Sequence, residues 1–216
     1  MANLAGQRAF LTLQNAIGDR LLQQTALSTS TYPTLARVKE EINTVYKRIY
    51  GERPWKWQLV STTLATVAGT TTYTLPDTVI EPYNMQIRSL GLDIQYISRE
   101  VFLKEQPYGW TNVGQTMPRF AIPAAPASNN AMQIDFWPTP DAIYTVNYDY
   151  RSRFTQLSGD TDIPVIPPEF DDLLVQGPLV ELYKMINDER WQGAKAEYEQ
   201  LWKKMWMADE RELNFM

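Results

Sequence analysis

The sequence contains no cysteine and no histidine among its 216 residues. The first absence excludes disulfides, thiol catalysis and thiolate metal sites. The second removes the commonest general base and the commonest metal ligand. Neither a glycine-rich phosphate-binding loop nor a Gly-x-Ser-x-Gly elbow occurs. We therefore predict a protein that is not an enzyme and that binds no cofactor and no metal.

Long apolar runs and clusters of positive charge are also missing. No stretch approaches membrane-spanning length, and the N-terminal residues lack the apolar core of a signal peptide. The formal net charge is −5, and no patch of lysine and arginine offers phosphates a binding surface. Apolar residues at 44% and charged residues at 21% are ordinary for a globular domain. We expect a soluble, intracellular protein with no membrane partner.

Helical spacing of apolar residues appears at both ends of the chain. It predicts a helix from about Gly6 to Gln24 and a second from Pro33 to Tyr50, with Gly51 as a left-handed cap. A third helical stretch, in two parts, runs from Pro168 to Trp206. Its second part carries one narrow stripe of large side chains, namely Trp191, Ala194, Tyr198, Leu201 and Met205. We expect this stripe to pack lengthwise on the helix of residues 33–50.

Within the third stretch, Gly177-Pro178 interrupts the helical pattern. A proline in a helix removes one backbone hydrogen bond and crowds the carbonyl of the residue four positions earlier. The dipeptide therefore predicts a kink at this point, or two helices joined there.

The middle of the chain has the composition and alternation of β-strands. Residues 59–67 and 70–75 predict a β-hairpin, and alternation over 90–96, 132–136 and 144–150 predicts further strands. A short helix is expected over Arg99–Glu105, and residues 107–130 have loop composition. Helices first, strands next and helices last indicate an α+β fold. We predict a helical bundle from residues 1–54 and 162–208, an inserted antiparallel β lobe over 55–161, and a tail over 209–216.

Three groups of side chains are candidates for binding a partner. Trp202 and Trp206 flank the terminal stripe, either as surface aromatics of a monomer or, as we favour, in a subunit interface. The tail carries Leu213, Phe215 and Met216, as a frayed end or as anchors that order on a partner. Tyr108 and Trp110 stand in the proline- and glycine-rich loop, which either folds back on the sheet or grips a sugar or a partner.

An acidic cluster spans the start of the third helical stretch and comprises Asp160, Asp162, Glu169, Asp171 and Asp172. Paired carboxylates can hydrolyse glycosides when a cleft holds them at the right separation. Calcium binding is a further option for such a cluster, but the EF-hand spacing is missing. A helix start also attracts negative charge, so a solvated capping turn explains the same residues.

Several motifs together resemble the head-to-tail adaptor (connector) proteins of tailed bacteriophages, particularly short-tailed ones. The resemblance covers about residues 35–201. The motifs are Trp57; Gly69-Thr70 followed by Tyr73-Thr-Leu-Pro76; Pro138-Thr-Pro-Asp141; Asp162-Ile-Pro-Val-Ile-Pro-Pro168 leading into Phe170-Asp-Asp-Leu-Leu174; and Arg190-Trp191 with Tyr198. Pro178 departs from the pattern.

The resemblance implies a structural virion protein at the head–tail interface, assembled in the host cytoplasm. It further implies a ring, usually dodecameric, that binds the portal protein and the tail (nozzle) protein while genome DNA passes through its lumen without sequence-specific binding. C-terminal segments of this family often reach into the portal, which suits Leu213 to Met216. Two alternatives remain open. One is a carboxylate glycosidase or carbohydrate-binding tail component that uses Asp160, Asp162 and the Tyr108–Trp110 loop. The other is a generic dimeric scaffold.

Overall fold

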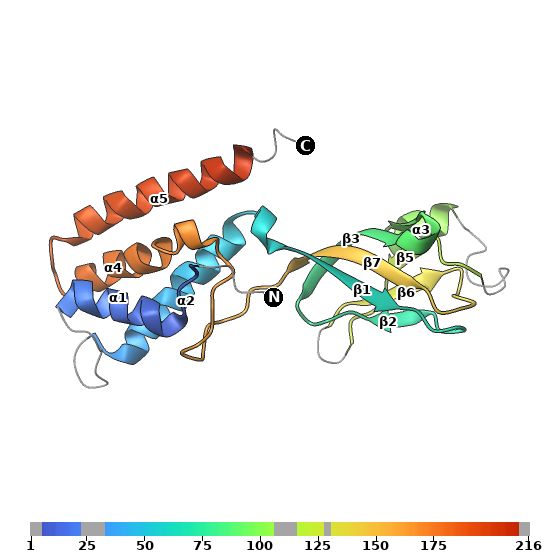
Figure 1. Ribbon diagram of the computed structural model, residues 1–216, viewed down its shortest axis with the longest axis horizontal. Coiled ribbons are helices and arrows are strands. Elements are labelled where there is room, and N and C mark those ends of the chain that lie inside the picture. The colour runs from blue at the N-terminus through green and yellow to red at the C-terminus, as the bar shows by residue number, and fades with distance from the viewer. Residues whose placement is uncertain (1–5, 23–32, 106–115, 128–130, 212–216) are drawn as a thin grey trace. The chain divides into compact units, whose positions relative to one another are not determined.

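The computed structural model describes residues 6–22, 33–105, 116–127 and 131–211 and divides the chain into two compact units (Figure 1). A helical unit combines residues 1–57 with 154–216, and a β unit comprises residues 58–153. Residues 55–57 and 154–161, predicted as part of the lobe, belong to the helical unit. The predicted α+β class, with helices from both ends and an inserted, mainly antiparallel lobe, is confirmed.

Four helices build the helical unit: α1 (Phe10–Leu22), α2 (Leu35–Glu52), α4 (Leu173–Met185) and α5 (Trp191–Arg211). The hydroxyl of Thr34 caps α2 by accepting a hydrogen bond from the Arg37 backbone N–H. The expected left-handed cap at Gly51 is wrong. The helix continues through Gly51 to Glu52, and the chain then extends at Arg53. A Cβ at position 51 would meet no other part of the fold within 4 Å, so packing does not require glycine there.

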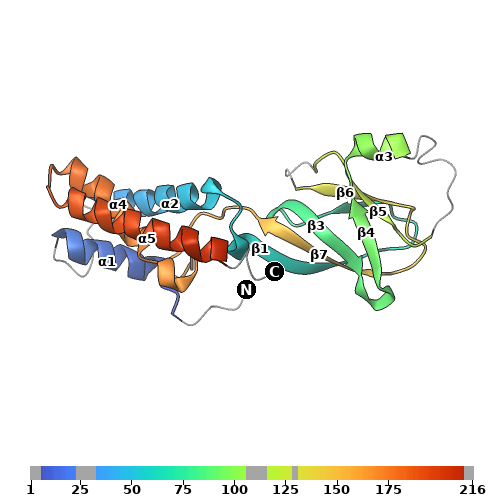
Figure 2. The same cartoon turned by 90° about the horizontal axis from the view of Figure 1, so that it is seen from above.

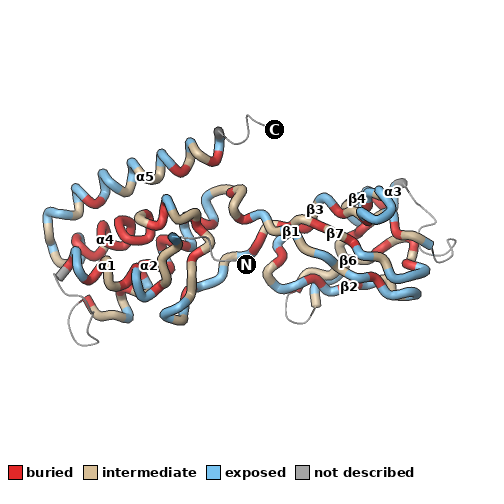
Figure 3. The backbone as a smooth tube through the Cα atoms, in the orientation of Figure 1, coloured by how far each residue is buried: buried red, intermediate tan, exposed pale blue. Residues whose placement is uncertain are grey.

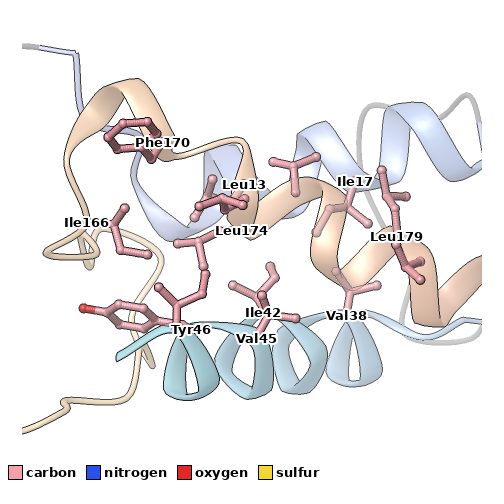
Figure 4. Packing of buried hydrophobic residues seen from close by; sticks show 14 of the residues in the cluster. Leu13, Ile17, Val38, Ile42, Val45, Tyr46, Ile166, Phe170, Leu174 and Leu179 are labelled. Atoms are coloured by element: carbon pink, nitrogen blue, oxygen red, sulfur yellow. The ribbon is translucent and has the colours of Figure 1, made fainter. Parts of the chain in front are cut away.

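Helix α4 is the centre of this unit. Every residue from Leu173 to Val180 is buried, so the helix is covered on all sides, as Figure 3 shows. Figure 4 shows the side chains of α1, α2 and α4 meeting in one apolar core. The stripes predicted on the first two helices form its outer layers. They comprise Phe10, Leu13, Ile17 and Leu21 on α1 and Leu35, Val38, Ile42, Val45 and Ile49 on α2; all are buried except Leu35, which is half-buried.

The predicted stripe on α5 faces inward, with Ala194 and Met205 buried and Trp191, Tyr198 and Leu201 half-buried. Its expected partner was wrong in part. Helix α5 packs mainly along α4, and the two lie side by side in Figures 1 and 2. Side chains of α2 reach α5 at single points, for example where the Arg48 guanidinium donates to the Tyr198 hydroxyl at 3.2 Å.

Helix α4 runs through both Gly177 and Pro178, so the expected junction of two helices there is wrong, while a kink at this point stays a prediction. The chain reverses later, between Met185 and Trp191, where Asn187 takes a left-handed conformation with φ of 55°. Glycine at 177 serves packing. A Cβ there would lie 2.7 Å from Cγ1 of Val45 and 3.1 Å from Cε2 of Tyr198. The absence of a side chain lets α4 approach α2 and α5 closely.

The β unit is one seven-stranded, curled sheet with strand order β1-β7-β3-β4-β5-β6-β2 (Figures 1 and 2). The strands are β1 (Leu59–Ala65), β2 (Thr72–Thr74), β3 (Val79–Ile87), β4 (Leu92–Tyr96), β5 (Phe120–Pro123), β6 (Gln133–Trp137) and β7 (Thr145–Ser152). All neighbours are antiparallel except β4 and β5. Alternate side chains of the strands build a separate apolar core. Helix α3 (Arg99–Glu105) follows β4, as predicted.

The predicted hairpin of residues 59–67 and 70–75 is wrong. Strand β1 pairs with β7 and β2 pairs with β6, so the two strands form opposite edges of the sheet. Tyr73 organises the turn between them, since its hydroxyl lies 2.8 Å from the Val67 backbone nitrogen and 3.0 Å from the Thr70 carbonyl oxygen. Strands β3 and β5 were not predicted. Strand β3 contains Pro82 and the left-handed Asn84 and shifts its register with β7, and β5 lies inside the expected loop.

Candidate interaction surfaces

Four tryptophans gather at one end of the helical unit, and we call Trp55, Trp57, Trp202 and Trp206 the tryptophan cluster. Trp55 is its centre. Only 1% of its surface is exposed, and its indole N–H donates to the Ile49 carbonyl at 2.7 Å. The ring stacks on Trp57 at 6.0 Å between centroids and meets Trp202 and Trp206 edge-on at 5.9 and 6.1 Å. Edge-on aromatic pairs add to the free energy gained by burial.

An ion pair holds the cluster from one side. The Arg53 guanidinium lies 4.4 Å from the centre of the Trp206 ring and 5.3 Å from that of Trp55. It also pairs with the buried Asp209 carboxylate at 3.2 Å. Asp209 accepts the Lys56 backbone N–H at 3.1 Å as well, which joins the end of α5 to the segment after α2. The guanidinium therefore combines a cation–π contact with a charge-assisted hydrogen bond.

A pocket of about 260 Å³ opens beside the cluster. Its apolar lining is provided mainly by Trp57, Phe170 and Met205, and its charged lining includes Glu169 and Asp209. The Trp57 indole N–H is buried and has no acceptor among the described residues. The pocket has the size and apolar character to receive a large side chain of another molecule.

Of the residues predicted to bind a partner, Trp202 and Trp206 lie among the described residues. Trp202 and Trp206 are half-buried, because Trp55 covers part of each ring. The indole N–H of Trp206 donates to Glu210 at 2.6 Å, and the Trp202 ring stacks on Tyr198. Tyr108, Trp110, Leu213, Phe215 and Met216 lie outside the described residues. Trp55 itself was missed as the centre of the cluster, since nothing local in the sequence links it to residues about 150 positions away.

The carboxylates of Asp160 and Asp162, which the glycosidase alternative would use, are engaged by other groups of the helical unit. Asp162 accepts the backbone N–H groups of Ser158 and Gly159 at 2.7 and 2.8 Å, and these bonds hold the pKa of its carboxyl below the usual range. Asp160 pairs with Lys39 at 3.2 Å. A catalytic acid needs a raised pKa, so Asp162 is poorly suited to that role. The arrangement gives no support to the glycosidase alternative.

Asp171 and Asp172 join the N-terminal segment to the start of α4. Asp171 is 1% exposed and accepts the Arg8 backbone N–H at 2.9 Å, and Asp172 accepts the Arg8 guanidinium at 2.8 Å. Burial raises the pKa of the Asp171 carboxyl, while Arg8 acts in the opposite direction. Both carboxylates thus have structural partners, as expected for an acidic helix start.

Many cations of the chain are already paired with carboxylates. Ion pairs engage Arg8, Arg37, Lys39, Arg53, Lys104, Lys184, Arg190 and Lys195. None of the helices within residues 6–22, 33–105, 116–127 and 131–211 has the length and the hydropathy of a membrane span. The same portion of the chain holds no group of carboxylates arranged to bind a metal ion.

Comparison with known proteins identifies the family of the chain. The family model for the SU10 adaptor protein matches residues 8–214, which is nearly the whole chain. The search of curated proteins found no match to this chain. Because the family match covers both the helical unit and the β unit, the chain belongs to the SU10 adaptor protein family and is a phage head–tail adaptor, a structural component of the virion.

Proposed function

We propose that copies of this chain form a ring between the portal protein and the tail (nozzle) protein, and that genome DNA passes through its lumen. The observation that carries the proposal is the family match over residues 8–214. A closed ring needs head-to-tail contacts between neighbouring copies, in which two different surfaces of the chain meet.

The charge of the chain supports a conduit without sequence-specific DNA binding. The net charge is −5, and many lysines and arginines have carboxylate partners. Proteins that hold DNA neutralise phosphates with unpaired cations, and their affinity depends on the number of those cations. A ring of acidic subunits offers phosphates little to hold, so DNA can slide through it.

The end of the helical unit that carries the tryptophan cluster is our proposed docking surface for neighbouring chains. The half-buried Trp202 and Trp206 present aromatic edges there, and the pocket lined by Trp57, Phe170 and Met205 opens beside them. Tryptophan and methionine are enriched where protein surfaces meet. We propose further that the tail, through Leu213, Phe215 and Met216, anchors the chain on the portal, and that Tyr108 and Trp110 contact a second partner.

Imaging tests the ring directly. The purified chain is mixed with the portal protein of the same phage and viewed by electron microscopy, and we expect an additional ring on the portal. A portal that remains bare at saturating concentration would contradict the proposal.

Variants of the tail test its role in docking. Leu213→Ser with Phe215→Ser should abolish the ring on the portal, whereas the matched control Asn214→Ser should leave it intact. Circular dichroism and the melting temperature establish that each variant is folded. A double variant that still forms the ring would contradict the anchor while leaving the adaptor function itself standing.

A further inference from the structure

The outer edge of β1 is an unprotected strand edge. Its ladder with β7 runs without a register shift from Leu59–Arg151 to Ala65–Thr145. It continues into Thr66, whose backbone N–H donates to the Tyr144 carbonyl at 2.9 Å. Backbone groups of successive residues point to opposite sides of an antiparallel strand. The backbone N–H and C=O groups of the even-numbered residues therefore hydrogen-bond to β7. The N–H and C=O groups of Leu59, Ser61, Thr63 and Ala65 face away from β7.

No described residue hydrogen-bonds to these outward backbone groups. The core of the β unit is also incompletely covered at this edge. None of the seven residues of β1 is buried, whereas alternate residues of the adjacent β7 are (Figure 3). Val60 and Leu64 pack against the apolar core yet stay half-exposed. One more strand beside β1 would pair the backbone groups and cover these two side chains.

Most proteins protect such an edge, and the opposite edge of this sheet is protected. Strand β2 has only three residues, and Pro76, which has no N–H to donate, follows two positions after its end. Strand β1 lacks each of these devices. It is seven residues long, contains no charge and no proline, and has no bulge.

The sequence of β1 suits pairing with a second copy of itself. Centred on Thr62, an antiparallel pair places Val60 of one copy opposite Leu64 of the other, Ser61 opposite Thr63, and Thr62 opposite Thr62. On the core side, Val60 then faces Leu64 on both sides of a central pair of Thr62 side chains, and on the other side Ser61 faces Thr63. Such cross-strand pairs stabilise a sheet, and the absence of charge avoids like-charge repulsion within the strand pair.

We propose that two free copies of the chain associate through their β1 edges into an antiparallel, two-fold dimer with one continuous sheet. A two-fold contact closes at two copies, whereas a ring requires head-to-tail contacts. The dimer is thus a form of the free chain, and the proposal does not depend on the ring. Because a single strand pair is a small interface, the association is reversible and depends on concentration.

Analytical ultracentrifugation over a range of concentrations tests the dimer. We expect the wild type to pass from monomer to dimer and the Thr63→Pro variant to remain monomeric. The Thr63 N–H faces the open edge, so proline there removes no bond to β7. Thr63→Lys should act likewise. Thr145→Lys is the matched control, because it adds the same charge to an exposed residue one strand further in. A wild type that stays monomeric throughout would overturn the proposal, as would a Thr63→Pro variant that dimerises normally.

A cross-link tests the register. Directly opposed residues without mutual hydrogen bonds have Cα atoms about 4.5 Å apart, which falls within the range that a disulfide can bridge. Since the chain has no cysteine, Thr62→Cys introduces a single thiol. We expect mild oxidation to convert the Thr62→Cys protein, but not a Thr145→Cys control, to a covalent dimer. No cross-link through position 62, or equal cross-linking of both variants, would overturn the proposed pairing. Electron microscopy tests the ring on the portal in a separate experiment. Failure of the dimer proposal can therefore be told apart from failure of the ring proposal.

Discussion

Gly177 and Val45 are in such close approach that a Cβ on the glycine would lie 2.7 Å from Cγ1 of the valine. Real Cβ atoms are not found that close to another heavy atom, so α4 could not keep its position against α2 with any larger residue. The glycine that first suggested a break in the helix thus permits the close approach of α4 to α2. Its neighbour Pro178 lies within the same unbroken helix.

Gly177→Ala should destabilise the helical unit by about 1–3 kcal/mol, because the added methyl group forces the helices apart. Urea unfolding followed by circular dichroism measures the effect. Gly193→Ala is the matched control. It lies in α5 with no atom near the site of a Cβ, and alanine favours a helix over glycine by up to about 1 kcal/mol. Equal effects of the two substitutions would show that the close approach does not matter.

Trp55→Ala should cost the helical unit about 3–5 kcal/mol of unfolding free energy, since it removes a buried indole that contacts three others. Trp206→Phe keeps an aromatic ring beside Trp55 and Arg53 and should cost much less. Chemical denaturation with fluorescence detection compares them. If truncation at Trp55 were as mild as Trp206→Phe, the cluster would not be organised around Trp55.

Tyr73→Phe should destabilise the β unit by about 1–2 kcal/mol, because the hydroxyl that organises the turn between β1 and β2 is lost. Tyr144→Phe provides the control. Its hydroxyl bonds to Asp141 in an exposed position, where water can replace the contact. Thermal unfolding of both variants gives the comparison, and a control as damaging as the test variant would contradict the assigned role of Tyr73.

The carboxyl of Asp162 should stabilise the chain in a pH-dependent way. Its folded-state pKa is lowered from the ordinary value of 3.8 by two backbone N–H donors. A lowered pKa adds stability above the unfolded-state value, and this contribution is lost as the pH falls through the folded-state value. Asp162→Asn should therefore lower the unfolding midpoint at about pH 7, and the difference from wild type should shrink below pH 3.8.

Asp160→Asn is the control for this titration, because it removes only an exposed ion pair with Lys39 and should change stability little. A difference between wild type and Asp162→Asn that stays constant from neutral to strongly acid pH would contradict the proposed linkage.

The amino-acid sequence by itself determined the local part of this structure. Apolar residues such as Phe10, Leu13 and Ile17 repeat at helical spacing, and that spacing places them on one face wherever the helix lies. The order of helical and strand-forming stretches was sufficient to indicate an α+β protein with an inserted lobe. Alternation also located β6 and β7, because period two follows from strand geometry alone.

Tertiary structure decided which elements meet. The stripe on α5 packs on α4 and not along α2, and β1 pairs with β7 and not with β2, because contacts between distant segments depend on how the whole core fills. Trp55 and Trp206 are about 150 residues apart, so no local pattern could join them. Strand β3 escaped prediction because Pro82 and Asn84 contradict strand propensity, and pairing with β7 and β4 overrides it. Neighbouring residues determine whether a segment forms a helix or a strand, whereas packing and hydrogen bonding across the complete fold determine which helices and strands contact each other.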